Sequence, residues 1–222
     1  MDILMIALTV PAAFFAMVLH GSVKALCSAR LNDPTPKRNG FLKGNPFKYV
    51  EPIGLVLMVI FGYGWTQVVP TTATYYRERK KGVLMVYVTP SVVCLLSGVA
   101  AAALVCMLGV SFFPYDTSVM IELVISPVRA NWSAFGAADY LLLILSLFAK
   151  SCVCLAIFNV LPVHPMDCSK ILLTFLPPDA AVKLTQYEKI IQIALLLLLA
   201  MGFIGMFLNP LAHAILRAVI WT

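Results

Sequence analysis

The chain has 222 residues, of which 61% are hydrophobic and 12% charged, with a formal net charge of +6 and a mean hydropathy of +0.94. Soluble domains are roughly 45–50% apolar and about 25% charged, so this composition excludes an ordinary water-soluble domain. Basic residues beside membrane segments orient a protein and meet anionic lipid, so we expect the lipid bilayer, and no nucleic acid, as a partner.

The apolar runs predict an all-α fold, a polytopic transmembrane helical bundle, because a helix is the only single segment that satisfies its own backbone in hydrocarbon. The first run has no basic start and no small-residue cleavage site, so we expect it to stay in the mature protein. Apolar side chains at helical spacing near the end of the chain predict a short interfacial helix. The predicted spans are residues 3–27, 83–113, 140–163 and 190–208, the interfacial tail is 210–222, and all lie in a single transmembrane domain, 1–222.

Residues 53–69 form a shorter, glycine-rich apolar stretch that could cross the membrane or dip in and return. The segment before it, 30–51, holds five basic and two acidic residues, and the segment after it, 77–81, holds four and one. Residues 114–139 hold one basic and three acidic residues. Because cytoplasmic loops collect Lys and Arg, two basic loops around one stretch predict that it is re-entrant. The alternative is that the charge rule fails here and the stretch crosses.

Residues 158–170 read FNVLPVHPMDCSK, which places Asn159, Pro162, Pro165 and Asp167 in one short motif. Earlier in the chain come the strings DPT at 33–35, NP at 45–46 and EPIG at 51–54. In this order and spacing, the strings resemble those of site-2 proteases, the intramembrane zinc metalloproteases, in a small form without PDZ or CBS modules. The resemblance runs from about residue 11 to about residue 205. It implies a site-2 protease type of bundle in which Asp167 stands at a zinc-ligand position.

The resemblance also places the zinc motif of the family, H-E-x-x-H, on residues 20–24. In that motif two His side chains one turn apart bind zinc, and the Glu activates a water molecule. His20 matches the first ligand, but Gly21 stands at the general-base position and Lys24 at the second His. General-base assistance is worth roughly 10²–10⁴ in rate, and an ammonium group has no lone pair for a metal. The family therefore implies zinc whereas this sequence opposes it, and Gly21 leaves the motif without a catalytic group at the general-base position.

Two interpretations of the altered site stay open. His164 and Cys168 could join His20 and Asp167 around a metal as substitute ligands. Alternatively, Lys24 could take the place of the metal and form an ion pair with Asp167, because a charge inside a membrane is costly unless it is paired. That pair would join the first span to the segment after residue 163 in a structural rather than a catalytic site.

The function that follows is that of a pseudoprotease, which binds membrane-embedded partners such as the transmembrane helices of other proteins without cleaving them. The first alternative is an atypical active intramembrane zinc metalloendopeptidase with substitute ligands, and the second is a channel or carrier-like bundle. Metal content would separate the pseudoprotease from the active metalloendopeptidase. The lack of a soluble appendage or a removable signal suggests a multi-pass protein of a prokaryotic cell (inner) membrane.

Overall fold

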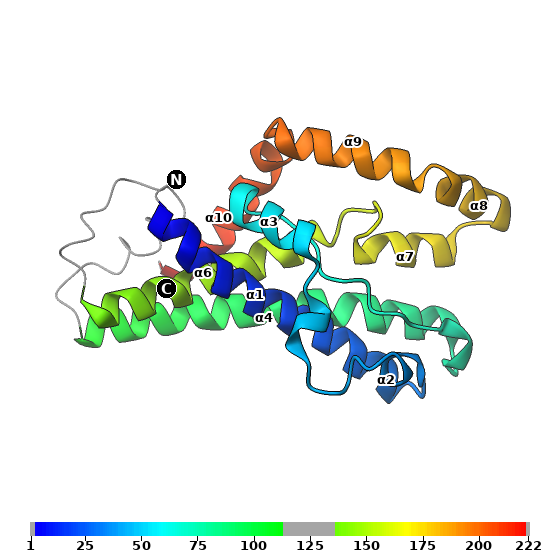
Figure 1. The fold of residues 1–222 in the computed structure, drawn as a ribbon, viewed down its shortest axis with the longest axis horizontal. Helices are drawn as coiled ribbons and strands as arrows, with labels where there is room; N and C mark the ends of the chain where they lie inside the picture. The colour runs from blue at the N-terminus through cyan, green and yellow to red at the C-terminus, as the bar shows by residue number, and fades with distance from the viewer. Residues whose placement is uncertain (1–2, 113–135, 221–222) are drawn as a thin grey trace.

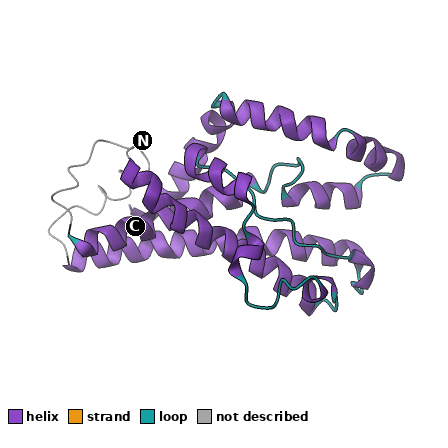
Figure 2. Ribbon diagram, in the orientation of Figure 1, coloured by secondary structure: helices purple, strands orange, loops and turns teal. Residues whose placement is uncertain are grey.

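The computed structural model describes residues 3–112 and 136–220, and these residues form helices joined by turns and loops, without a strand in either range (Figure 2). The all-α prediction is confirmed. The helices are α1 (Ile3–Arg30), α2 (Thr35–Arg38), η1 (Pro46–Tyr49), α3 (Pro52–Phe61), η2 (Ala73–Tyr75), α4 (Arg79–Phe112), α6 (Ala137–Phe158), α7 (Asp167–Phe175), α8 (Pro178–Gln186), α9 (Glu188–Ala200) and α10 (Phe203–Ile220).

Three helices, α1, α4 and α6, are long and apolar enough to cross a membrane, as predicted for three of the four spans. Helix α6 ends at Phe158, so the predicted span 140–163 is too long by one turn and its last residues form a loop. The three long apolar helices are compatible with a multi-pass membrane protein. Most of the acidic segment 114–139 lies outside the described residues.

The fourth predicted span, 190–208, is not one straight helix. Helices α9 and α10 meet at an angle of 70°, and Gly202 in the break has a positive φ of 79°. Glycine adopts this left-handed conformation without steric cost, which ends one helix and turns the chain. The predicted tail, 210–222, does not begin a separate helix at Pro210. Helix α10 runs through Pro210 and buries Ala212 and Leu216 against α4 and α6.

Helices α1, α4 and α6 pack together along much of their length, and α10 packs on α4 and α6 (Figure 1). Small residues line the contact. Ala16 and Cys94 are both fully buried, and a Cβ on Gly98 would lie 2.9 Å from the carbonyl oxygen of Ala149. Small residues let helix backbones approach closely where lipid supplies no hydrophobic drive for association. This close approach brings α1 against the carboxyl end of α6, where the candidate site lies.

Residues 52–72 form a hairpin, with α3 running out and an extended segment running back beside it. Gly54 faces the backbone of Trp65, and Gly64 faces the backbone of Gly54, so closely that a Cβ on either glycine would overlap a carbonyl oxygen. The backbone amide of Gln67 then donates a hydrogen bond of 3.0 Å to the carbonyl of Tyr49. The chain thus returns to the end at which it entered the hairpin.

Asp33 joins the segments on the two sides of this hairpin. Its buried carboxylate accepts hydrogen bonds from the hydroxyl of Ser28 at 2.7 Å and from the backbone amides of Thr35 at 2.9 Å and Thr72 at 2.7 Å. Burial alone would raise the pKa of the Asp33 carboxyl, but the hydrogen bonds from Thr35, Thr72 and Ser28 outweigh burial and hold that pKa below its ordinary value. The two basic segments therefore lie side by side.

Candidate functional site

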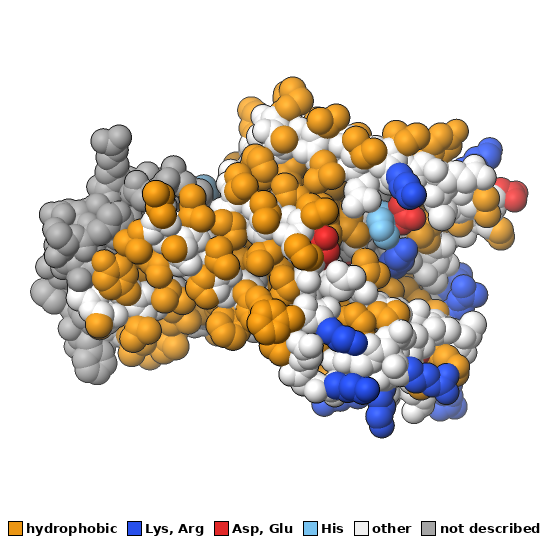
Figure 3. Space-filling view, viewed as in Figure 1, with side chains coloured by type: hydrophobic (Ala, Val, Ile, Leu, Met, Phe, Trp, Pro, Cys, Tyr) orange, Lys and Arg blue, Asp and Glu red, His pale blue; other side chains and the backbone are white. Residues whose placement is uncertain are grey.

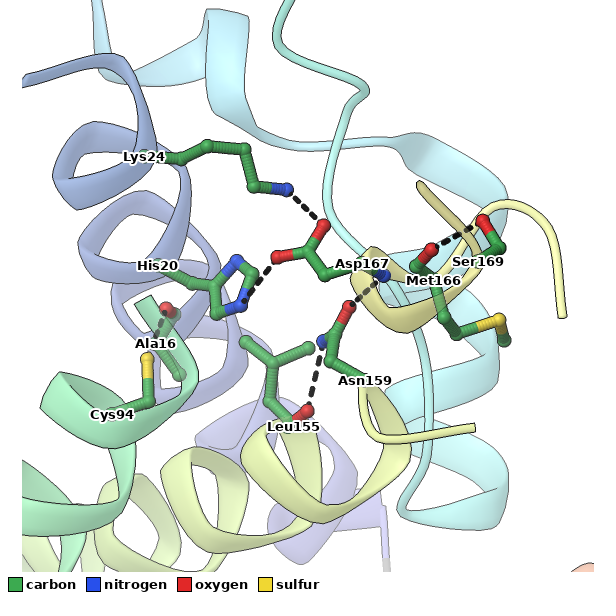
Figure 4. A network of polar contacts seen from close by, with 9 residues as sticks. All are labelled: Ala16, His20, Lys24, Cys94, Leu155, Asn159, Met166, Asp167 and Ser169. Carbon is green, nitrogen blue, oxygen red and sulfur yellow. Dashed lines mark hydrogen bonds and ion pairs between the residues drawn. The ribbon is translucent and has the colours of Figure 1, made fainter. Parts of the chain in front are cut away.

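Three polar side chains from α1 and α7 meet in the interior. His20 and Lys24 lie one turn apart on α1, and Asp167 is the first residue of α7 (Figure 4). The ammonium of Lys24 donates a hydrogen bond to Oδ1 of Asp167, and Nε2 of His20 lies 3.5 Å from Oδ2 of the same carboxylate. All three residues are buried. The structure thus brings together the residues that the sequence analysis singled out in the two motifs.

The loop between α6 and α7 holds Asp167 in this position. Asn159 caps the end of α6, where its side-chain amide donates to the carbonyl of Leu155 at 2.8 Å. The side-chain oxygen of Asn159 accepts a 3.4 Å bond from the backbone amide of Asp167, and the backbone carbonyl of Asn159 accepts from the amide of Cys168 at 3.1 Å. Asn159 is therefore a positioning residue for the carboxylate, and Pro162 and Pro165 lie in the loop between them.

Tyr87 on α4 completes the surroundings of Lys24. The Lys24 Nζ atom lies 5.6 Å from the centre of the Tyr87 ring, within the range of a cation–π interaction. A buried ammonium needs such compensation, because taking a charge out of water costs several kcal/mol. The ion pair with Asp167 and the ring of Tyr87 together offset the cost of burying the Lys24 side chain.

Tyr49 lies directly against Gly21. A Cβ at position 21 would sit 2.7 Å from Cδ1 and 2.9 Å from Cβ of Tyr49, which is closer than real Cβ atoms approach. The hydroxyl of Tyr49 donates to the backbone carbonyl of Phe41, which fixes the ring in place. The space that a side chain at position 21 would need is therefore filled. Sequence reasoning missed Tyr49 and Tyr87, because both contacts depend on how segments far apart in the sequence pack together.

The substitute ligands do not complete a metal site. His164 contacts the carboxylate of Glu188 on α9, and Lys170 lies 3.7 Å from the same Glu188 oxygen. Within residues 3–112 and 136–220, no group of three or more His, Cys, Asp or Glu side chains is arranged to hold a metal. His164 and Cys168 thus do not form a metal-binding group with His20 and Asp167.

The residues present do not fit a catalytic zinc ion. Catalytic zinc has three protein ligands and an open position, whereas only His20 and Asp167 offer donor atoms here. The ammonium of Lys24 takes one carboxylate oxygen and would repel a dication. Both ring nitrogens of His20 and Oδ2 of Asp167 are buried without a hydrogen-bond partner. One imidazole nitrogen and one carboxylate oxygen leave this group one ligand short of a metal site.

Comparison with known proteins adds one relative. The chain is 26% identical over 202 residues to "Putative zinc metalloprotease YwhC" of Bacillus subtilis (strain 168), covering 90% of this chain and 80% of the relative. This similarity supports a metalloprotease-like relationship. No family model matches the chain, and no solved structure matches it.

Proposed function

We propose that this chain is a pseudoprotease of site-2 protease type, a multi-pass membrane protein that binds membrane-embedded partners without cutting them. The observation that carries the proposal is the contact between Lys24 and Asp167. In the resembled family the corresponding aspartate is a zinc ligand, and here its carboxylate holds an ammonium instead.

The chemistry of peptide hydrolysis explains why this exchange matters. A metalloprotease needs a metal that lowers the pKa of bound water and a carboxylate that takes its proton. Gly21 offers no proton acceptor, and Lys24 offers no lone pair while it is protonated and paired. The site therefore lacks both parts of the machinery that would activate water.

The ring of Tyr49 supports the same proposal independently of the metal. It fills the space beside Gly21 that an acidic side chain would need. The loss of the general base is thus matched by packing around the position, which is expected of a site kept for its structure.

Partner binding is proposed from the faces that the fold leaves open. Helix α3 exposes Ile53, Val56 and Ile60, and helix α9 exposes Ile190 and Leu197, each by more than half. Such faces contact lipid tails or the helices of other membrane proteins. We therefore propose transmembrane helices as the partners and a prokaryotic inner membrane as the location.

Metal analysis and a cleavage assay test the proposal together. Purified wild-type protein should contain no stoichiometric zinc and should bind a membrane-anchored reporter without cutting it. The variant G21E/K24H should bind little more zinc than the wild type, because the glutamate introduced at position 21 meets the Tyr49 ring. The variant G21E/K24H/Y49A, which removes that ring, should bind more zinc. Stoichiometric zinc in the wild type, lost in H20A and D167A, together with chelator-sensitive cleavage, would overturn the proposal.

An atypical active zinc metalloendopeptidase is the second candidate. It is favoured by the buried atoms of His20 and Asp167 that have no hydrogen-bond partner, and by the name of the Bacillus subtilis relative. The same experiment decides between the two candidates, since only the enzyme requires a metal in the unmodified chain.

A further inference from the structure

The net charge of the protein comes from a single stretch of the chain. Residues 30–81 hold nine Lys or Arg residues and three acidic residues, a net charge of +6, which equals that of the whole protein. The rest of the chain holds seven basic and seven acidic residues. The nine basic residues are Arg30, Lys37, Arg38, Lys43, Lys48, Arg77, Arg79, Lys80 and Lys81.

The fold gathers these residues onto one surface, which we call the basic face. All nine side chains are exposed. They come from two segments separated by the uncharged hairpin, and the hydrogen bonds of Asp33 to Thr35 and Thr72 hold those segments together. A further bond of 2.9 Å joins the hydroxyls of Thr35 and Thr72. Lys and Arg side chains accordingly cluster at the end of the molecule that carries α2 and the start of α4 (Figure 3).

The three acidic residues of this stretch neutralise little of the basic face. Asp33 is only 1% exposed, and its oxygens are occupied by hydrogen bonds inside the fold. The carboxylate of Glu51 accepts from the backbone amide of Gly54 at the start of α3. Glu78 forms a surface ion pair with Lys81 at 2.6 Å. The basic face therefore presents a positive surface to whatever lies outside it.

Exposed apolar side chains lie in the same stretch of the chain as the basic face. Phe47 is 73% exposed, Ile53 60% and Tyr75 46%. A soluble polyanion would cover the cations and leave these apolar groups in water. The boundary of a bilayer takes both, since aromatic and aliphatic groups enter it while Lys and Arg reach the headgroups. The combination points to a lipid surface rather than to a soluble partner.

We propose that the basic face binds the phosphate headgroups of anionic phospholipids, with Phe47, Ile53 and Tyr75 placed at the boundary of the bilayer. The proposal does not depend on the proposed function, because none of the nine cations belongs to the candidate site. It also assigns the basic face to the membrane surface that is richer in anionic lipid.

Native mass spectrometry of the full chain in detergent tests this proposal. The protein is offered equal amounts of phosphatidylglycerol and phosphatidylcholine, and the ratio of the two bound lipids is counted. The variants K37Q/R38Q and R77Q/R79Q each remove two charges from one segment of the basic face. The variant K183Q/K189Q removes two exposed charges from α8 and α9 and is the matched control.

The wild type should retain phosphatidylglycerol in preference to phosphatidylcholine. Each cation near an anionic surface contributes on the order of a fivefold change in affinity, so each basic-face variant should lower the ratio about fivefold or more. The control should stay close to the wild type. Added salt should remove the preference of the wild type for phosphatidylglycerol. This measurement uses no substitution, so it does not depend on whether a variant folds.

Three results would overturn the proposal. The first is a wild type without a preference for phosphatidylglycerol, or with one that salt does not change. The second is an equal loss in K183Q/K189Q, or a loss confined to one basic-face variant, because a single face requires both segments. The third is displacement of the lipid by millimolar inorganic phosphate, which would identify free phosphate as the ligand.

Discussion

Lys24 and Asp167 are 143 positions apart in the sequence and meet in the interior of the bundle. Each side chain alone would be a buried charge, which a membrane protein tolerates only when the charge has a partner. Together they form a neutral unit beside His20 that links α1 to α7. The energetic role of this pair therefore depends on both partners being present.

Replacing one partner should cost more than replacing both. Lys24→Met leaves the Asp167 carboxylate buried and unpaired, and removal of one partner of a buried pair costs about 3–5 kcal/mol. The double variant K24M/D167L should recover most of that loss, because apolar residues can replace a buried ion pair. Thermal unfolding in detergent compares the wild type, the single variants K24M and D167L, and the double variant.

The surface pair of Lys81 and Glu78 gives the control for this experiment. The Lys81 side chain is 76% exposed, and exposed pairs contribute about 0–1 kcal/mol. Lys81→Met should therefore change the unfolding temperature little. If K24M and D167L were each as stable as the wild type, a structural role for the buried pair would be wrong.

At this scale the sequence could predict which residues meet but not how they are enclosed. The order of motifs placed Asp167 opposite residues 20–24, and the cost of a buried charge suggested Lys24 as its partner. The approach of Tyr49 to Gly21 left no sequence signal, because it depends on the path of the loop before α3. The contact of His164 with Glu188 also left no sequence signal, because it depends on how α9 packs against the loop between α6 and α7.

The hairpin of residues 52–72 shows how glycines determine the shape of an element. Gly54 and Gly64 allow the helix and the returning segment to touch through their backbones. The sequence showed a short glycine-rich stretch, and the structure shows that two of these glycines permit the close backbone contact of the hairpin.

Gly54→Ala should disrupt this hairpin. The new methyl group would overlap the backbone oxygen of Trp65, which cannot rotate away as a side chain can. Overpacking in an interior costs about 1–3 kcal/mol, so we expect a loss of at least about 3 kcal/mol here. Gly136→Ala is the control, because a Cβ there would meet only the Asp139 side chain at 3.6 Å. Equal unfolding temperatures for the two variants would contradict the close backbone contact.

The junction at Asp33 predicts a dependence on pH. Because the pKa of the folded carboxyl is depressed, its stabilisation is complete above the unfolded pKa of about 3.9. It is lost as the pH falls through the lower folded pKa. Asp33→Asn should cost at least about 2 kcal/mol at neutral pH, since hydrogen bonds to a charged group are lost.

The measurement is the difference in unfolding free energy between the wild type and D33N from pH 7 to pH 3. The difference should be constant down to about pH 5 and shrink below that, as the unfolded carboxyl begins to take up protons. A difference that grew as the pH fell would reverse the sign and contradict the hydrogen bonding of Asp33.

The ends of helices could be predicted where a charged residue or the length of an apolar run marks them. They could not be predicted where backbone conformation alone ends the helix. Helices α1, α4 and α6 follow from long, predominantly apolar runs. The break at Gly202 lies in an uncharged run, 190–208, and it is revealed by the bend between α9 and α10 and by the positive φ of that glycine. Whether glycine bends a helix or merely sits in it depends on tertiary contacts that a single sequence does not contain.

Across the whole molecule, the asymmetry of charge follows from the hairpin. The chain enters and leaves residues 52–72 at the same end, so the two basic segments share one surface although many residues separate them. The loop charges predict that residues 53–69 are re-entrant, which stays a prediction. The hydrogen bonds of Asp33 to Thr35 and Thr72 give the physical basis for the shared surface.

Topology can be tested by labelling from one side of the membrane. Cysteines introduced as K43C and K80C are exposed positions in the two basic segments. An impermeant maleimide should label both from the same side of oriented vesicles, and neither from the other. The unsubstituted protein controls for its own six cysteines, none of which is fully exposed. Labelling of the two positions from opposite sides would mean that residues 52–72 cross.

The contact of Tyr49 with Gly21 also limits which residues position 21 can accept. A side chain introduced at position 21 alone would share its space with the Tyr49 ring. A carboxylate at position 21 therefore requires a change at position 49 as well, so the two positions should be substituted together rather than one at a time.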